Sequence, residues 1–175
     1  MTHDELVALI RPGITTTGGT WADFGAGTGH FTRALRDVLG AEAVIHAVDR
    51  DAAALRQQEK DILTHTADFT KPLNLPLLEG ALMANALHFI LNQQAALAQV
   101  LSYLRPGGVL ILVEYAVNAP RSFIPHPVPY TRFVTLAEKL DLVDIRQLHT
   151  RTSPRTGLAM YSAAACTPVV HSPQE

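Results

Sequence analysis

The sequence predicts a three-layered α/β/α sandwich, in which helices cover both faces of a seven-stranded, mostly parallel sheet. Short apolar stretches typical of strands alternate with stretches of helical periodicity, which is the pattern of this class. The run Val109–Val113 is apolar throughout, as expected of a strand buried on both faces of a parallel sheet. The 175 residues are 47% hydrophobic, which is enough for one sizeable core. We therefore expect a single domain over residues 1–166 and a tail over residues 167–175.

The first half of the chain contains clear signals for the ends of helices. Thr2 and Glu5 have the spacing of a capping box, so a short helix begins there and ends near Pro12. Gly40 is well placed to end the second helix, because glycine readily adopts the left-handed conformation. Up to residue 66 the sequence predicts, in order, a helix at 3–11, a strand at 21–24, a helix at 31–39, a strand at 43–48, a short helix from 51 and a strand at 62–66. Pro72 in the next connection predicts that a third such helix is reduced or absent.

The second half continues the alternation and ends in a hairpin. The sequence predicts a strand at 80–84, a helix at 92–104, the strand at 109–113, a proline-rich segment at 118–129, a helix at 130–140, and strands at 142–148 and 158–165. The last two strands are joined by a short turn, so the final strand is expected to run antiparallel and to close one edge of the sheet. Residues 171–175 are expected to be frayed.

A glycine-rich loop, Asp23-Phe24-Gly25-Ala26-Gly27-Thr28-Gly29, joins the first strand to the second helix. Glycine lets the backbone turn tightly and approach a ligand, and the helix N-terminus offers unpaired N–H groups. Asp49 ends the next strand, where a carboxylate can accept hydrogen bonds from a ribose diol. The dinucleotide fingerprint would need glycine where this chain has His30, and the Asp23 carboxylate would repel a pyrophosphate but suits a cationic amino group. The pattern therefore predicts a nucleoside-containing cofactor.

The glycine-rich loop resembles motif I of the class I S-adenosylmethionine-dependent methyltransferases. Three later segments are similar to that family in the same order: Ala67-Asp68-Phe69, the strand and turn at 81–90, and the L-x-P-G-G turn with its strand at 104–114. The resemblance covers residues 20–114 firmly and the rest by topology. It implies a Rossmann-like sheet, a class I methyltransferase activity, S-adenosylmethionine as methyl donor and S-adenosylhomocysteine as product, with no metal.

The resemblance also implies which residues bind the cofactor. We expect the carboxylate and glycines of motif I at the methionine portion, Asp49 at the ribose hydroxyls, Asp68 and Phe69 at the adenine, and Asn85 beside the methyl group. The full predicted set is Asp23, Gly25, Ala26, Gly27, Gly29, Asp49, Arg50, Asp68, Phe69 and Asn85.

Each charged or aromatic member of this set has an alternative interpretation. Asp23 could cap the loop through backbone N–H groups, Asp49 could be the N-cap of the next helix, and Asp68 could be an ordinary turn carboxylate. Phe69 could belong to the core, and Arg50 could be a solvated charge.

The sequence identifies no general base with certainty. The candidates are His88, Tyr115 and His126, followed by Glu114 and Tyr130. A histidine suits proton removal near neutrality because its ordinary pKa lies there, although His88 can equally be structural. The histidines show no metal-binding spacing, so we expect no metal site.

A small metabolite is the expected methyl acceptor, with a protein side chain as second choice. The net charge of −2 gives no general attraction to nucleic acid or to an anionic membrane, and no N-P-P-Y-type motif follows the fourth strand. The arginines at positions 146, 151 and 155 around the final hairpin, with Arg121, suggest an anionic acceptor. The alternative is a solvated surface turn.

A cytoplasmic protein, monomeric or homodimeric, is expected from the absence of any apolar run near ~18 residues and of a secretory signal. The single Cys166 excludes an intrachain disulfide. Two other functions stay open. One is a non-catalytic S-adenosylmethionine-binding module. The other is an NAD(P)-dependent oxidoreductase, which His30, Asp23 and the lack of a Tyr-x-x-x-Lys set disfavour.

Overall fold

The computed structural model describes residues 1–169. The helices of this part are α1 (His3–Ile10), α2 (His30–Leu39), α3 (Ala52–Leu55), α4 (Gln93–Leu101) and α5 (Tyr130–Lys139), with 3₁₀ turns η1 (Arg11–Gly13) and η2 (Leu87–Phe89). The strands are β1 (Thr20–Phe24), β2 (Val44–Asp49), β3 (Leu63–Thr66), β4 (Leu78–Ala84), β5 (Leu104–Tyr115), β6 (Val143–Thr152) and β7 (Ala159–Cys166). None of these helices combines the length and apolar character needed to cross a membrane. The expected fraying at 171–175 falls outside the described residues.

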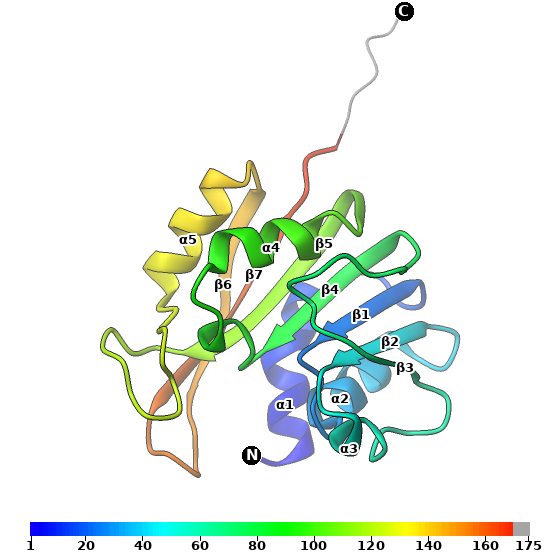
Figure 1. The fold of residues 1–175 in the computed structure, drawn as a ribbon, viewed down its shortest axis with the longest axis horizontal. Helices are drawn as coiled ribbons and strands as arrows, with labels where there is room; N and C mark the ends of the chain where they lie inside the picture. Colours follow the sequence, from blue (N-terminus) through cyan, green and yellow to red (C-terminus); the bar gives the residue numbers. More distant parts are fainter. Residues whose placement is uncertain (170–175) are drawn as a thin grey trace, which may run out of the picture.

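The strands form one seven-stranded sheet in the order β3-β2-β1-β4-β5-β7-β6 (Figure 1). Four neighbouring pairs are parallel, whereas β7 runs antiparallel to both β5 and β6. The predicted mostly parallel sheet with an antiparallel last strand is therefore confirmed. The chain winds outward from β1 to β3 and then returns to β4 on the other side of β1. This reversal creates a switch point between β1 and β4, where ligands of open α/β sheets bind.

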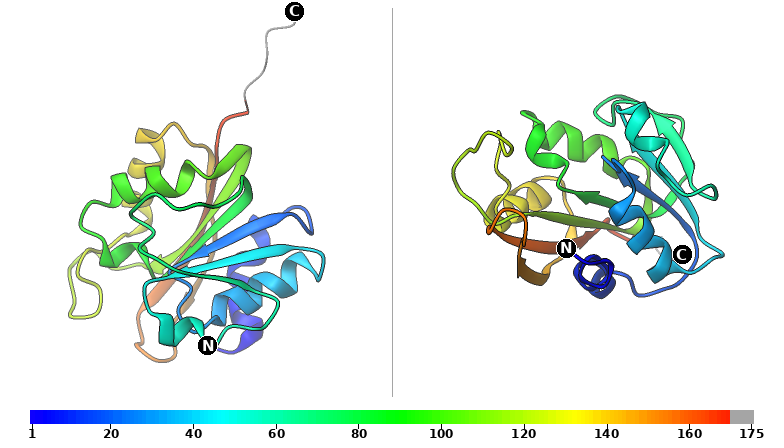
Figure 2. Two further views of the ribbon diagram at one scale, coloured as in Figure 1. Left: turned by 45° about the vertical axis from the view of Figure 1, so that its right-hand side comes forward. Right: turned by 90° about the horizontal axis from the view of Figure 1, so that it is seen from below.

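Helices cover both faces of the sheet, so the predicted sandwich is also confirmed. Helices α4 and α5 lie on one face and α1, α2 and α3 on the other (Figures 1 and 2). Successive residues of β5 alternate between the two cores. Leu110 and Leu112 pack in the core with α4 and α5, while Ile111 and Val113 pack in the core with α1 and α2. All four are fully buried, which explains why the run carries no polar residue.

The ends of several helices follow the signals in the sequence. The Thr2 hydroxyl accepts the Glu5 N–H and the Glu5 carboxylate accepts the Thr2 N–H, so the capping box that begins α1 is formed. Gly40 ends α2 with φ of 85°. The N-cap of α3 is Asp51, whose carboxylate accepts the N–H groups of two residues in the first turn. The interpretation of Asp49 as this N-cap is therefore wrong.

Around β4 and β5, one prediction is confirmed and one boundary differs from the prediction. No helix forms between β3 and β4, as Pro72 predicted. Strand β5 begins at Leu104 rather than at Val109, because Leu104 already pairs with Leu78 ahead of a shift in register. Helix α4 accordingly ends at Leu101, before the residues that the strand recruits.

Candidate functional site

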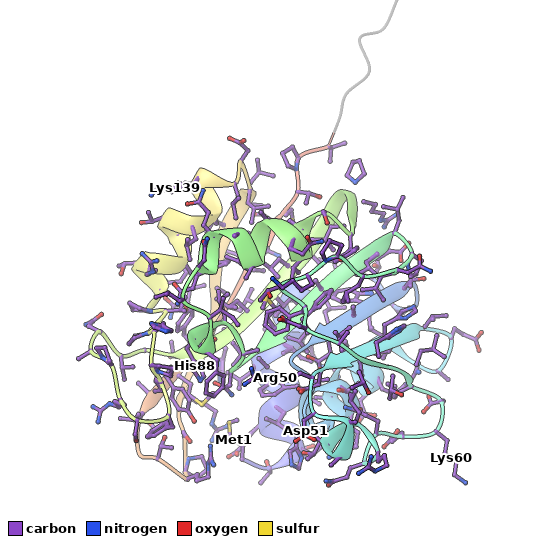
Figure 3. The ribbon with its side chains drawn as sticks, in the orientation of Figure 1. Met1, Arg50, Asp51, Lys60, His88 and Lys139 are labelled. Carbon is purple, nitrogen blue, oxygen red and sulfur yellow. The ribbon has the colours of Figure 1, made fainter. Side chains whose placement is uncertain are left out.

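Two adjoining cavities lie at the carboxyl ends of β1, β2 and β4. The first, the β2 cavity, has a volume of about 200 Å³ and extends from Asp49 to Phe69 and the turn after β4. The second, the hairpin cavity, has a volume of about 470 Å³ and extends from the glycine-rich loop to the turn between β6 and β7. Gly25 and Asn85 line both cavities. Figure 3 shows Arg50, which follows β2, and His88, which follows β4, at this end of the sheet.

Most predicted cofactor residues line one of these cavities. The β2 cavity is lined by Gly25, Asp49, Arg50, Asp68, Phe69 and Asn85, and the hairpin cavity by Asp23, Gly25, Ala26, Gly27 and Asn85. Gly29 lines neither. It starts α2 with φ of 87°, and a Cβ there would lie 2.5 Å from Oε1 of Gln58. Gly29 therefore serves the turn into the helix and its packing against Gln58.

The glycine-rich loop is held against the end of β2. The N–H groups of Gly25 and Ala26 both donate to the Val48 carbonyl, at 2.8 and 3.1 Å. Oδ2 of Asp49 accepts the Gly27 N–H at 2.8 Å, and its Oδ1 accepts the Asp51 N–H at 2.9 Å. Each carboxylate oxygen keeps a further lone pair. The Asp49 side chain thus fixes the loop and can still accept hydrogen bonds from a molecule in the β2 cavity.

Asp23, the last residue but one of β1, is a buried carboxylate with one oxygen left unpaired. Its side chain is almost completely buried, and Oδ2 accepts the Thr32 hydroxyl at 2.7 Å. Oδ1 has no hydrogen-bond partner within residues 1–169. Burial raises the pKa of Asp23 to about 7, and the nearby Asp49 carboxylate adds to the effect. The interpretation of Asp23 as a cap of the loop backbone is wrong, since its bonded oxygen receives a side-chain hydroxyl.

Asn85 follows β4 with a left-handed backbone, φ 53°, which few residues other than glycine adopt. Its N–H donates to the Val113 carbonyl at 2.8 Å, so the position is held by β5. Its Oδ1 is buried and has no partner in the described part of the chain. A buried polar atom left unpaired is uncommon in native structures, and such atoms often bind a water molecule or a ligand. Asn85 therefore offers a free acceptor where the two cavities meet.

Asp68 and Phe69 make structural contacts and also line the β2 cavity, so both interpretations that the sequence left open apply to them. Oδ1 of Asp68 accepts the N–H and the hydroxyl of Thr70, and these hydrogen bonds lower the pKa of Asp68. Phe69 packs edge-on against the buried Phe24 with ring centroids 6.4 Å apart. Both residues nevertheless line the β2 cavity, as does the exposed Arg50.

His88 is buried and is engaged by Glu114. Its Nδ1 lies 2.6 Å from Oε2 of Glu114, and Oε1 of Glu114 accepts the N–H groups of Leu87 and His88 at 3.0 and 3.2 Å. Neither His88 nor Glu114 lines the β2 cavity or the hairpin cavity. This arrangement fastens the turn after β4 to strand β5, and it places the two side chains in a structural position.

Of the other candidates, only Tyr115 reaches a cavity. It ends β5, is 5% exposed and lines the hairpin cavity. His126 lies outside both cavities, and its N–H donates to the His88 carbonyl. Tyr130 packs against Tyr161 with ring centroids 5.8 Å apart. Residues 1–169 contain no group of three His, Cys, Asp or Glu side chains that could hold a metal ion.

The far wall of the hairpin cavity was not identified from the sequence. It is formed by Met1, Leu6, Ser153, Arg155 and Met160, whereas Phe31 of α2 lines the cavity next to the glycine-rich loop. The expected arginine cluster is also corrected. Arg151 pairs with Glu5 of α1 at 2.5 Å, and Arg146 pairs with Asp144 beside a different cavity. Of these three arginines, Arg155 alone lines the hairpin cavity. Its position at the predicted hairpin turn was the one feature of the sequence that indicated this wall.

The sheet order and the glycine-rich loop at its switch point define the class I methyltransferase fold. The Methyltransferase domain family matches residues 22–110, and the chain belongs to this family. A search of curated proteins found no match to the sequence.

Several solved structures share the fold at low sequence identity. Phosphoethanolamine N-methyltransferase 2 of Haemonchus contortus, in complex with phosphomonomethylethanolamine and S-adenosylhomocysteine, has a TM-score of 0.74 at 14% identity. That similarity covers 94% of this chain and 52% of the other, so the chain spans about half the length of that enzyme. A Bacillus halodurans structure described as a putative methyltransferase has a TM-score of 0.76 at 12% identity, covering 95% and 100%. The [4+2]-cyclase SpnF has a TM-score of 0.73 at 15% identity, covering 96% and 82%. Such identities show the fold alone, and the fold does not determine the reaction.

Proposed function

We propose that the protein is an S-adenosylmethionine-dependent methyltransferase that acts on a small molecule. In this proposal the nucleoside of the cofactor occupies the β2 cavity and its methionine portion occupies the adjoining part of the hairpin cavity. The observation that carries the proposal is the unpaired, buried carboxylate oxygen of Asp23 beside the glycine-rich loop.

A buried carboxylate without a cationic partner is costly, and an ammonium group placed beside it would remove that cost. Asp23 lines the hairpin cavity next to Gly25 and Gly27, so the α-amino group of a methionine moiety there would meet its free Oδ1. A dinucleotide would instead bring a pyrophosphate to this loop, and the same carboxylate would repel it. The charge at this one position therefore supports a cofactor with a cationic amino-acid end.

The β2 cavity fits the other half of the cofactor. Asp49 keeps free lone pairs for the ribose hydroxyls, and Phe69 offers an aromatic surface beside Asp68 for the adenine. Gly25 lies between this cavity and the turn after β4, and a Cβ there would approach the Ala86 Cβ to 2.5 Å. Only glycine therefore fits at this position, where φ is also +80°.

When bound, S-adenosylmethionine supplies an electrophilic methyl group on a sulfonium. The acceptor's lone pair forms the new bond to the methyl carbon, the S–C bond breaks with its electron pair on sulfur, and any proton on the acceptor passes to solvent. The chain contributes position and exclusion of water, which can lower such a barrier by several kcal/mol. Asn85 and Tyr115 line the region where an acceptor would approach.

Calorimetry with S-adenosylhomocysteine tests the cofactor assignment. We expect binding to the wild-type protein and a loss of roughly tenfold to a hundredfold in affinity for Asp23→Asn, because a hydrogen bond to a charged group is removed. The exposed Glu59→Ala variant, which changes a carboxylate outside both cavities, is the control and should bind normally. Absence of heat with the well-folded wild-type protein would contradict the proposal.

A non-catalytic S-adenosylmethionine-binding module is a second proposal, favoured by the engagement of His88 with Glu114. Incubation with methyl-labelled cofactor and a pool of metabolites separates the two. Labelled product that depends on intact Asp23 supports the enzyme, whereas binding without any transfer supports the module.

A further inference from the structure

The hairpin cavity contains a wall that the cofactor assignment does not use. Apart from the glycine-rich loop, it is lined by the apolar side chains of Leu6 and Met160 and by the polar side chains of Tyr115, Ser153 and Arg155. At about 470 Å³ the cavity is more than twice as large as the β2 cavity, so it has room beyond the methionine portion.

The polar groups of this wall are hydrogen-bond donors without partners in the described residues. The hydroxyls of Tyr115 and Ser153 make no hydrogen bond to another residue within 1–169, and neither oxygen is fully buried, so both are open to the cavity that these residues line. Arg155 has no carboxylate within ion-pair distance in the same part of the chain, whereas Arg151 and Arg146 are each paired with one. A guanidinium and two hydroxyls that line one cavity are suitable groups for binding a carboxylate or a phosphate.

The backbone of this wall is held by hydrogen bonds in the hairpin turn and by one ion pair. The Ser153 N–H donates to the Leu158 carbonyl at 2.8 Å, and the Gly157 N–H donates to the Ser153 carbonyl at the same distance. The ion pair between Arg151 and Glu5 joins the hairpin to α1, which carries Leu6. The backbone that carries Ser153 and the helix that carries Leu6 are thus tied to the rest of the fold, whereas the Arg155 side chain is exposed at the turn.

We propose that this wall binds the methyl acceptor through an anionic group, a carboxylate or a phosphate, held by Arg155 and the Ser153 hydroxyl, with the apolar part of the acceptor against Leu6 and Met160. The proposal rests on the proposed function, since it assigns the remaining space to the acceptor. It also gives the site two opposite ends. Asp23 receives a cation on one side of the cavity, and Arg155 receives an anion on the other.

Binding of small probes to the protein saturated with S-adenosylhomocysteine tests this assignment. Benzoate and phenyl phosphate are the anionic probes, benzyl alcohol is the neutral probe, and ligand-observed NMR titration gives their affinities. We expect one or both anionic probes to bind at least tenfold more tightly than benzyl alcohol, and the stronger of the two identifies the preferred anion.

Arg155→Glu should weaken the anionic probe at least tenfold, and Arg155→Lys should retain part of its affinity. Arg11→Glu is the matched control, because Arg11 is exposed, lies in η1 and lines neither cavity. Ser153→Ala gives a second test that leaves the net charge unchanged, and it should weaken the anionic probe without affecting benzyl alcohol.

Equal affinities of the anionic and neutral probes, no binding of any probe at millimolar concentration, or equal effects of Arg155→Glu and Arg11→Glu would each overturn the assignment. Calorimetry of S-adenosylhomocysteine on the same variants keeps the two proposals separate. Unchanged cofactor affinity in Arg155→Glu isolates a failure of the acceptor site, whereas no cofactor binding to the wild-type protein is a failure of the proposed function.

Discussion

The buried carboxylate of Asp23 makes the stability of the ligand-free protein depend on pH in an unusual direction. Its pKa is raised from an ordinary value of 3.8 to about 7, mainly by burial. The folded state therefore holds a proton that the unfolded state releases, and the free energy of unfolding falls as pH rises between these two values. The difference corresponds to about 4 kcal/mol at pH above 7, and more than half of it develops between pH 5 and pH 8.

Asp23→Asn removes this charge while keeping the shape of the side chain and an acceptor for the Thr32 hydroxyl. We expect the gain in unfolding free energy over wild type to grow by roughly 2–3 kcal/mol between pH 5 and pH 8. Any constant cost of the new amide cancels in that difference.

Urea denaturation of both ligand-free proteins across this range, followed by the fluorescence of the single, buried Trp21, measures the effect. The same variant should bind S-adenosylhomocysteine less tightly. Asp23 would thus lower the stability of the ligand-free protein and raise its affinity for the cofactor. If the difference between variant and wild type were constant with pH, Asp23 would not carry the burial penalty described above.

Three further variants test the loop and the turn that frame the site. Asp49→Ala should weaken S-adenosylhomocysteine roughly tenfold by calorimetry, because the ribose acceptor and the anchor of Gly27 are both lost; unchanged affinity would contradict the role of this carboxylate. Glu114→Ala should lower the free energy of unfolding by about 3–5 kcal/mol, since His88 and two backbone N–H groups lose a buried partner. A loss under about 1 kcal/mol in denaturant titrations would show that this pair does not hold the turn. Gly29→Ala should cost about 1–2 kcal/mol for the left-handed backbone, plus the contact with Gln58. In a Gln58→Ala background the contact is absent, so Gly29→Ala should still cost the backbone part of this free energy. No loss of stability from Gly29→Ala in that background would refute the backbone contribution.

The order of strands and helices could be predicted because each element has a local cause. The apolar run in β5 reflects burial on two faces, the Thr2–Glu5 pair begins α1, and Pro72 prevents a helix between β3 and β4. Asp49 and the glycine-rich loop were predicted to lie together because carboxyl ends of parallel strands meet at one edge of the sheet. These inferences need only the residues themselves and their neighbours in sequence.

The features that sequence reasoning missed depend on contacts between distant parts of the chain. The sequence does not distinguish Arg146, Arg151 and Arg155 from one another. In the structure, however, Arg146 and Arg151 are paired with carboxylates, and the partner of Arg151 lies 146 positions away in α1. Likewise, the pairing of His88 with Glu114 requires β4 and β5 to be neighbours. The early start of β5 also follows from its partner strand, because Leu104 is drawn into the sheet by Leu78.

The two sides of the hairpin cavity come from different parts of the polypeptide. The glycine-rich loop and the start of α2 belong to the central segment that the family match spans, whereas Leu6 comes from α1, and Ser153, Arg155 and Met160 come from the hairpin of β6 and β7. Substitutions in these outlying segments can alter which molecules fit without disturbing the nucleotide-facing residues. Proteins built on this plan could thus diversify in what they recognise while conserving how they hold a shared cosubstrate, and libraries aimed at new specificity would best vary the two flanking segments together.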